Sequence, residues 1–332
     1  MENHINFCIQ NNIVFEKLIG IGFYGEVFKG HFKKGDKKIA IKTLNKEKMN
    51  QQGDEMKQYL EKAFFRELEA MKKCYCENSV KLYRNFETKD YYYIIMELCD
   101  NDLSNELKKR RKGFSAKEIK FIMSQLNNAF KKMDENKIIH RDLKIENILI
   151  KYKDEIKKDF IPKFCDYGFS KILKENDLIF TGSGRASKKT PEIWEGKPYN
   201  SKVDLWSVGV IIHQLHFKAL PYKGNNENEL YKQIKENVPY KKSEDLILRD
   251  LIDHLLVKDP SKRYSWEDYF EHPFFEPEKQ KKNIYIQKLR KIMIINYLLN
   301  LLKQDPLIFH MVHFLLFVYI IHFHYFLCKV EL

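Results

Sequence analysis

The spacing of apolar residues changes once along the chain, near residues 97–101, and this change constrains the fold most. Before it, residues 13–97 hold short runs with the pattern of strands and one helical stretch at 56–73. After it, apolar residues recur at helical spacing, and Ser115 with Glu118 forms a capping box. The strand-like runs are Val14–Ile21, Glu26–Phe32, Lys38–Leu44, Lys81–Phe86 and Tyr91–Met96. We expect a small sheet with one helix, followed by a larger, mainly helical unit.

Length and charge limit the class of protein. A chain of 332 residues with 44% hydrophobic content can bury a core and is long enough for about two units. The formal net charge is +13, but the positive residues are mostly Lys and are spread along the whole sequence. An Arg-rich stripe interleaved with aromatic residues is missing from this pattern, which argues against specific nucleic-acid binding. A basic surface favours acidic substrates only weakly.

The cysteines indicate a reducing compartment. They form no paired CxxC sets and no zinc-type spacing with histidines, and the first residues lack the apolar core of a signal peptide. We therefore expect a cytoplasmic protein. We interpret the close spacing of Cys74 and Cys76 as a chance feature of a loop and not as a metal site. The cysteines are Cys8, Cys74, Cys76, Cys99, Cys165 and Cys328.

A glycine-rich run lies between the first two strand-like segments. Gly20, Gly22 and Gly25 precede Val27, and no helix pattern follows them, which argues against a dinucleotide-binding fingerprint. Glycines in such a hairpin allow the backbone to lie close over nucleotide phosphates. From this motif alone, an ordinary glycine-rich hairpin remains the alternative.

A lysine stands on the third strand-like run, which is otherwise apolar. An isolated buried ammonium group would lose its charge, so Lys42 should pair with an acid or bind an anion. Glu67, on the helical stretch, is the partner we expect. Two separate solvated charges remain the alternative.

The run 140–147, HRDLKIEN, carries the strongest chemical signal. Asp142 can accept the proton of a hydroxyl, Lys144 can neutralise a transferred phosphoryl group, and Asn147 offers a neutral oxygen to a metal. Asp166, in the sequence DYG, adds a carboxylate suited to Mg²⁺. Phosphoryl transfer needs mainly positioning and charge neutralisation, and these residues supply both.

From about residue 13 to 275, the order of these motifs resembles the eukaryotic protein kinase domain of the serine/threonine type. The resemblance implies an α+β, bilobal protein-kinase fold, in which a small antiparallel sheet with one helix (13–97) joins a mainly helical lobe (101–275). Residues 1–12 would be an N-terminal extension and 276–332 a tail. The implied activity is transfer of the γ-phosphoryl group of ATP, with Mg²⁺, to Ser or Thr hydroxyls of protein substrates.

The resemblance also implies a role for each site residue. Asp142 would be the catalytic base assisted by Lys144, Lys42 would bind phosphates while pairing with Glu67, and Asn147 and Asp166 would hold Mg²⁺. Met96 would be the gatekeeper, and 97–99 the hinge that contacts adenine. The implied nucleotide site consists of Ile19, Gly20, Gly22, Gly25, Val27, Ala40, Lys42, Met96, Glu97, Cys99 and Leu149.

Other landmarks and departures surround this set. Glu192, in the sequence TPE, should pair with Arg263, and Asp204 begins the expected buried central helix. Tyr167 replaces the usual Phe, so its hydroxyl needs a partner. Arg185 stands where the family normally has a Thr that contacts the catalytic residues, which keeps a nucleotide-binding pseudokinase scaffold as the alternative function.

One regulatory feature is also expected. Thr181 is a candidate for an activating phosphate that Arg141 could receive, with a solvated loop threonine as the alternative.

The tail admits three interpretations. After a basic amphipathic stretch at 284–302, residues 307–328 contain no charge and would span about 33 Å as a helix. They could anchor a cytosol-facing kinase in a membrane, pack on the domain as a helix, or reflect an incorrectly assigned end of the coding sequence. His310 and His313 are costly in lipid and argue against the anchor. The runs 166–171 and 96–99 resemble those of autophagy-initiating and of calcium/calmodulin-like kinases, without deciding between them or identifying a physiological substrate or an oligomeric state.

Overall fold

The computed structural model describes residues 4–21, 25–35, 37–51, 53–154, 156, 159–172 and 190–277. The chain divides into two units, residues 1–275 and 276–332, and the described elements all belong to the first. Gly22, Thr181, Arg185 and the apolar stretch 307–328 lie outside the described residues. Within the described ranges, no helix is both long and apolar enough to cross a bilayer.

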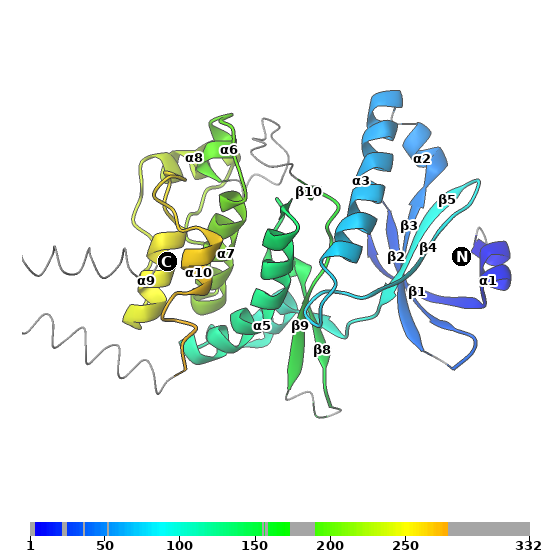
Figure 1. Cartoon of the computed structure of the whole chain (residues 1–332), viewed down its shortest axis with the longest axis horizontal. Helices are drawn as coiled ribbons and strands as arrows, with labels where there is room; N and C mark the ends of the chain where they lie inside the picture. Colours follow the sequence, from blue (N-terminus) through cyan, green and yellow to red (C-terminus); the bar gives the residue numbers. More distant parts are fainter. Residues whose placement is uncertain are drawn as a thin grey trace, which may run out of the picture. The chain divides into compact units, whose positions relative to one another are not determined.

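An antiparallel sheet of five strands forms the N-terminal lobe, in the order β1-β2-β3-β5-β4 (Figure 1). Each strand boundary lies within one residue of its predicted position, because polar residues and glycines between the apolar runs mark the turns. The predicted α+β class with a small antiparallel sheet is confirmed. The strands are β1 (Ile13–Ile21), β2 (Glu26–Phe32), β3 (Lys38–Asn45), β4 (Leu82–Glu87) and β5 (Tyr91–Glu97).

One face of the sheet is covered by α3 (Asp54–Lys73), which follows a short helix, α2 (Lys46–Asn50). The apolar face of α3 is buried against the sheet, and the ring of Phe64 lies 4.7 Å from that of Tyr92. This packing turns Glu67 inward, where only 5% of the residue is exposed. The sequence predicts α3 two residues shorter, and it does not predict α2 because five residues give too little periodicity.

The opposite face is covered by α1 (Ile5–Asn11), so that α1 and α3 enclose the sheet between them (Figure 1). Phe7 stacks on Tyr93 with ring centroids 3.8 Å apart, and Nδ1 of His4 lies 3.0 Å from the Tyr93 hydroxyl. The side chains of β5 alternate between the two cores, since Tyr92 faces α3 while Tyr93 faces α1. The predicted N-terminal extension thus forms a helix that completes the core.

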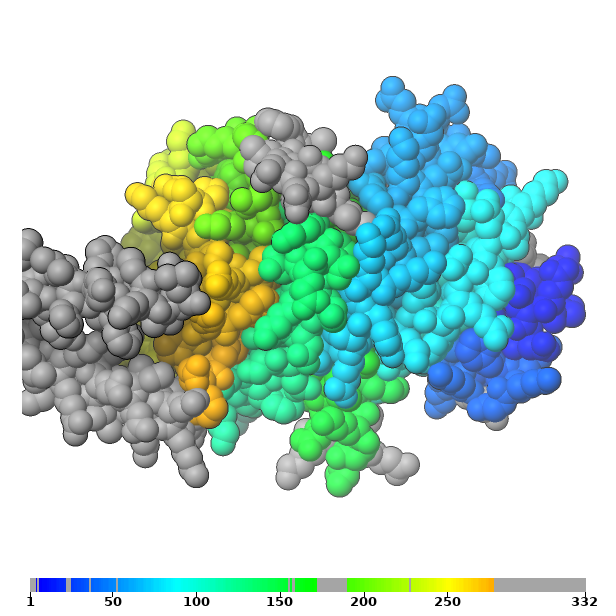
Figure 2. Space-filling view, in the orientation of Figure 1, coloured from blue at the N-terminus to red at the C-terminus, as the bar shows by residue number. Residues whose placement is uncertain are grey.

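The C-terminal lobe is built on two long helices, α5 (Ala116–Glu135) and α7 (Lys202–Phe217). The predicted capping box is present, with Ser115 and Glu118 bonded to each other's backbone N–H groups. Helix α7 is buried on all sides and contacts both α5 and α9. Figure 2 shows the green segment that contains α5 in direct contact with the orange segment that contains the last helix, α10. The other helices are α4 (Leu103–Lys109), α6 (Pro191–Trp194), α8 (Glu227–Lys235), α9 (Leu246–Leu255) and α10 (Trp266–Phe270).

Short strands and one 3₁₀ helix, η2 (Ile145–Asn147), carry the loop 140–147. One sheet has the order β6-β8-β9 and a second pairs β10 with β7. The N–H of Val80 donates to the carbonyl of Phe164 over 2.8 Å, which ties the residues before β4 to the end of β9. The strands are β6 (Asn101–Asp102), β7 (Ile138–Ile139), β8 (Ile148–Tyr152), β9 (Phe160–Phe164) and β10 (Lys171–Ile172).

The packing of α1 generates a stability prediction. Phe7→Ala removes the ring of a residue that is only 5% exposed, and it should lower the free energy of unfolding by about 2 kcal/mol. This loss of stability is smaller than for a Phe in the middle of a core, because α1 can detach from the sheet while the rest of the domain stays folded. Thermal unfolding should show a decrease of about 4–8 °C. Ile9→Ala, on the same helix with 63% of the residue exposed, is the control and should change nothing. Equal melting temperatures for both variants would contradict the packing role of α1.

Candidate active site

Three charged side chains from three elements meet at one point. The Nζ of Lys42, on β3, lies 2.7 Å from both carboxylate oxygens of Glu67, on α3. The same Nζ lies 3.5 Å from Oδ1 of Asp166, which follows β9. The Lys42 and Glu67 side chains are 15% and 6% exposed, whereas that of Asp166 is 38% exposed. The most accessible of the three is therefore the carboxylate predicted to meet a metal.

Lys42 favours the charged form of both carboxylates, although burial, together with Asp166, raises the pKa of Glu67 above its ordinary value. Burial alone would lower the pKa of Lys42, but the carboxylates of Glu67 and Asp166 outweigh burial and raise it above its ordinary value. In turn, the positive charge of Lys42 lowers the pKa of Asp166, although burial opposes this. At neutral pH the site therefore presents an ammonium group suited to phosphate and a carboxylate suited to a hard cation.

The loop 140–147 brings Asp142, Lys144 and Asn147 together. Lys144 Nζ donates a hydrogen bond to Oδ2 of Asp142. The side-chain nitrogen of Asn147 donates to the backbone carbonyl of Asp142 over 3.0 Å and to its carboxylate over 3.3 Å. All three residues are buried. Because the nitrogen of Asn147 is used in this way, its oxygen is the atom left for a cation.

A buried carboxylate on α7 holds this loop in place. Asp204 accepts hydrogen bonds from the backbone N–H groups of His140, over 2.7 Å, and of Arg141, over 2.9 Å. Arg141 has a left-handed backbone with φ of +66°, which costs free energy in a residue other than glycine. Burial raises the pKa of Asp204 to about 7, against the lowering effect of the two N–H bonds. The sequence indicates Asp204 only as part of the central helix, and this anchoring role is an addition from the structure.

The segment after β9 is also under backbone strain. Asp166 has φ of +66°, and the N–H of Cys165 before it donates to the carbonyl of Asn147 over 3.0 Å. This bond places the Asp166 carboxylate beside the loop 140–147. Next to it, Tyr167 is 1% exposed, and its hydroxyl has no hydrogen-bond partner among the residues that the structure describes.

The residues predicted to bind nucleotide lie in register on neighbouring strands. Gly20 pairs with Val27, Val27 pairs with Lys42, and Ala40 pairs with Met96. A side chain at Gly25 would collide with the carbonyl oxygen of Thr43, which lies only 1.8 Å from where a Cβ would stand, so the fold itself requires this glycine. At Gly20 the atom closest to such a Cβ, among the residues that the structure describes, lies 3.8 Å away. These residues therefore leave space beside Gly20.

The predicted hinge follows β5. Met96, Cys99 and Leu149 are partly buried and pack against the main core. Burial raises the pKa of the Cys99 thiol to about 12, which keeps it neutral. Ile19, also predicted at the nucleotide site, is 45% exposed at the end of β1.

The predicted pair of Glu192 and Arg263 is present. The guanidinium group of Arg263 donates two hydrogen bonds, of 2.7 and 2.9 Å, to the two carboxylate oxygens of Glu192. Both side chains are almost fully buried. This bidentate pair fixes the start of α6 against the end of the helical lobe.

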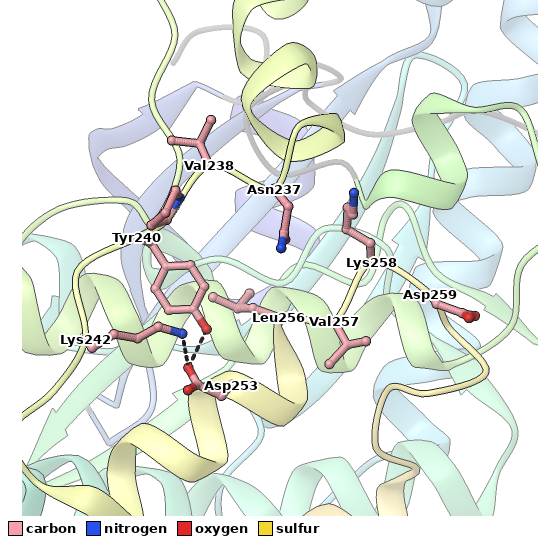
Figure 3. Close-up of a pocket in the computed structure, with 10 residues that line it drawn as sticks. Asn237, Val238, Tyr240, Lys242, Asp253, Leu256, Val257, Lys258 and Asp259 are labelled. Atoms are coloured by element: carbon pink, nitrogen blue, oxygen red, sulfur yellow. Dashed lines mark hydrogen bonds and ion pairs between the residues drawn. The ribbon is translucent and has the colours of Figure 1, made fainter.

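A pocket of about 520 Å³ opens elsewhere in the helical lobe, among residues 237–259 (Figure 3). Asp253 there accepts hydrogen bonds from the Tyr240 hydroxyl, over 2.6 Å, and from Lys242, over 2.5 Å. These three polar side chains on the wall of the pocket are therefore hydrogen-bonded to one another. No residue predicted for the site lines it.

The family model of the protein kinase domain matches residues 13–275. The chain belongs to the protein kinase family. A probable myosin light chain kinase of Dictyostelium discoideum is 31% identical over 280 residues, covering 82% of this kinase and 84% of the relative. Calcium-dependent protein kinase 4 of Plasmodium falciparum is 30% identical over 293 residues, and this kinase spans only 53% of its length. Mouse serine/threonine-protein kinase ULK3 is 30% identical over 291 residues, with 86% of this kinase and 59% of the relative covered.

Sequence reasoning missed several supporting residues. The Nδ1 atom of His140 lies 3.3 Å from the backbone nitrogen of Asp142, and Cys165 joins β9 to Asn147. Lys163, on β9, forms an ion pair with Glu97 that no motif indicated. His140 and Cys165 adjoin recognised motifs, which could have drawn attention to them. Lys163 gave no such signal, because its partner lies far away in sequence.

Tyr167 generates a second stability prediction. A buried hydroxyl without a partner costs free energy, so Tyr167→Phe should raise the stability by about 1 kcal/mol and the melting temperature by about 2–4 °C. The matched control is Tyr93→Phe, which removes a hydroxyl that does have a partner, Nδ1 of His4. That variant should be less stable than the wild type. A destabilised Tyr167→Phe protein would disprove the unsatisfied state of this hydroxyl.

His140 generates a pH prediction. Burial lowers the pKa of His140 below its ordinary value of 6.5, against the raising effect of Asp142 and Asp166. Since the unfolded chain then binds this proton more tightly, the contribution of His140 to stability should fall as the pH drops below about 6.5, whereas Asp204, with its pKa raised to about 7, contributes in the opposite direction. Removal of the His140 contribution should therefore shift the change in melting temperature between pH 7.5 and 5.5 upwards in His140→Gln relative to the wild type.

Proposed function

We propose that this chain is an active serine/threonine protein kinase, which transfers the γ-phosphoryl group of ATP to Ser or Thr hydroxyls of protein substrates. The observation that carries the proposal is the contact of Lys42 with both Glu67 and Asp166. Phosphoryl transfer depends on positioned charges of this kind more than on covalent chemistry. The relative named as a serine/threonine-protein kinase supports the class of acceptor.

In this proposal the N-terminal lobe binds the nucleotide. Adenine lies between Val27 and Ala40 above and Leu149 below, with the backbone of 97–99 at its edge. Lys42 contacts the phosphates, and Glu67 holds its ammonium group in position. The glycine-rich turn covers the phosphates, and the space beside Gly20 is compatible with this role.

The helical lobe supplies the chemistry. The carboxylate of Asp142 accepts the proton of the substrate hydroxyl, and Lys144, already bonded to that carboxylate, neutralises charge on the phosphoryl group. The oxygen of Asn147 and the carboxylate of Asp166 form a donor set that fits Mg²⁺. When bound, Mg²⁺ would neutralise phosphate charge.

A nucleotide-binding pseudokinase scaffold is the alternative, and its motivation is Arg185, which lies outside the described residues. The kinase activity and the scaffold differ in whether Asp142 matters for phosphate incorporation. Membrane anchoring through 307–328, with a cytoplasmic kinase domain, stays a prediction, because that stretch also lies outside the described residues.

The decisive measurement is transfer of radiolabelled phosphate from ATP to a general protein substrate. Asp142→Asn should reduce incorporation by at least about 100-fold, because the base is lost while the side chain keeps its size. Asp90→Asn, at an exposed turn before β5, is the matched control and should be as active as the wild type.

Two results would count against the proposal. Incorporation that is equal in the wild type and in Asp142→Asn would exclude Asp142 as the base. Nucleotide binding without any Asp142-dependent incorporation would favour the scaffold.

A further inference from the structure

A buried lysine on β9 forms an ion pair with the connector between the lobes, residues 97–101. Lys163, on β9, lies with its Nζ 3.1 Å from Oε2 of Glu97, the last residue of β5. The two side chains are 9% and 17% exposed, so water screens the pair little. The same Nζ donates to the carbonyl of Glu77 over 2.6 Å. An ammonium group this enclosed therefore has two fixed partners in the N-terminal part of the chain.

The carboxylate of Glu97 has few other hydrogen-bond partners among the described residues. Besides Lys163, its Oε2 accepts the backbone N–H of Lys81 over 3.3 Å, and no further partner is present among the described residues. Removal of one member of a buried ion pair leaves the other desolvated without compensation. Without Lys163, the Glu97 carboxylate would turn towards water and would move the backbone that carries it.

The lysine is also linked to the opposite side of the proposed adenine site. Lys163 pairs directly with Leu149 across β8 and β9. Residues directly opposite in an antiparallel pair point to the same face of the sheet. Lys163 thus connects Leu149, on one side of the proposed adenine site, to Glu97, on its edge.

A second lysine of the same hairpin contacts the connector less deeply. Nζ of Lys151 donates to the carbonyl of Leu98 over 3.1 Å and lies 3.4 Å from Asp100. Its side chain is 39% exposed, so this contact is weakened by solvent. Of the two lysine contacts with the connector, that of Lys163 is therefore the less screened by solvent.

We propose that Lys163 is a positioning residue for the nucleotide, acting through Glu97 to fix the connector relative to Leu149. This inference rests on the proposed function, since it takes 97–99 and Leu149 as the adenine site. It assigns to Lys163 no contact with the nucleotide. Lys163 sets the width of the adenine site, and through it the affinity for ATP.

The test measures nucleotide affinity apart from catalysis. A fluorescent ATP analogue with Mg²⁺ is titrated into the full-length chain and into Lys163→Met, which keeps the length of the side chain and removes its charge. The dissociation constant should rise about tenfold, because displacement of the connector misplaces the adenine contacts. The KM for ATP should rise equally, whereas kcat and the KM for the protein substrate should stay within about twofold.

Four further variants separate positioning from general stability. Lys163→Arg should restore most of the affinity. Glu97→Gln should weaken binding as Lys163→Met does, and the double variant should be no weaker than either single one, since both changes break one interaction. Lys153→Met, at an exposed lysine of the same hairpin, should bind like the wild type. If Lys163→Met does not fold, Glu97→Gln provides the same measurement.

The outcomes distinguish this proposal from the one on which it rests. A wild-type chain that does not bind the analogue would overturn the proposed function as well. A wild type that binds, together with an equally tight Lys163→Met, would overturn only the positioning role. Additive losses in the double variant would also overturn it, because Lys163 would then act independently of Glu97.

Discussion

The ammonium group of Lys42 joins three parts of the chain that lie far apart in sequence. It contacts Glu67 from the helix on one face of the sheet and Asp166 from the helical lobe. A buried ammonium group is stable only with partners of opposite charge, so the sheet, α3 and the segment after β9 must assemble together. The charges on which the proposed chemistry depends are thus the same charges that fix the relative placement of these elements.

A second constraint operates from within the helical lobe. Arg141 and Asp166 both adopt φ of +66°, and each such residue costs on the order of 1–3 kcal/mol. Asp204 offsets the first through two backbone hydrogen bonds, and the bond between Cys165 and Asn147 supports the second. The fully buried helix α7 can hold a carboxylate in this position because the surrounding apolar residues leave it no room to move. The strained residues adjoin or supply the side chains of the site.

The strands, α3 and the contact between Glu192 and Arg263 could be predicted because each depends on a local pattern or a recognisable motif. Contacts between residues that lie far apart in sequence and share no motif could not be predicted. Lys163 and Glu97 lie on separate strands without a shared motif, and Asp204 bonds backbone atoms, which leave no trace in side-chain identity. The helix α1 escaped prediction for a related reason. It is short, lacks a side-chain cap, and is stabilised by rings on β5 and not by its own sequence.

Because α1 covers one face of the sheet, the folded unit and the match to the family model begin at different residues. The match to the family model begins at residue 13, whereas the folded unit includes the residues before it. Tyr91 and Tyr93 are buried in part by His4 and Phe7, so a chain shortened to the family match would present an aromatic face to water. Such a face is a site for self-association. In this kinase, residues that belong to no recognised motif therefore shield an aromatic face of the folded domain from water.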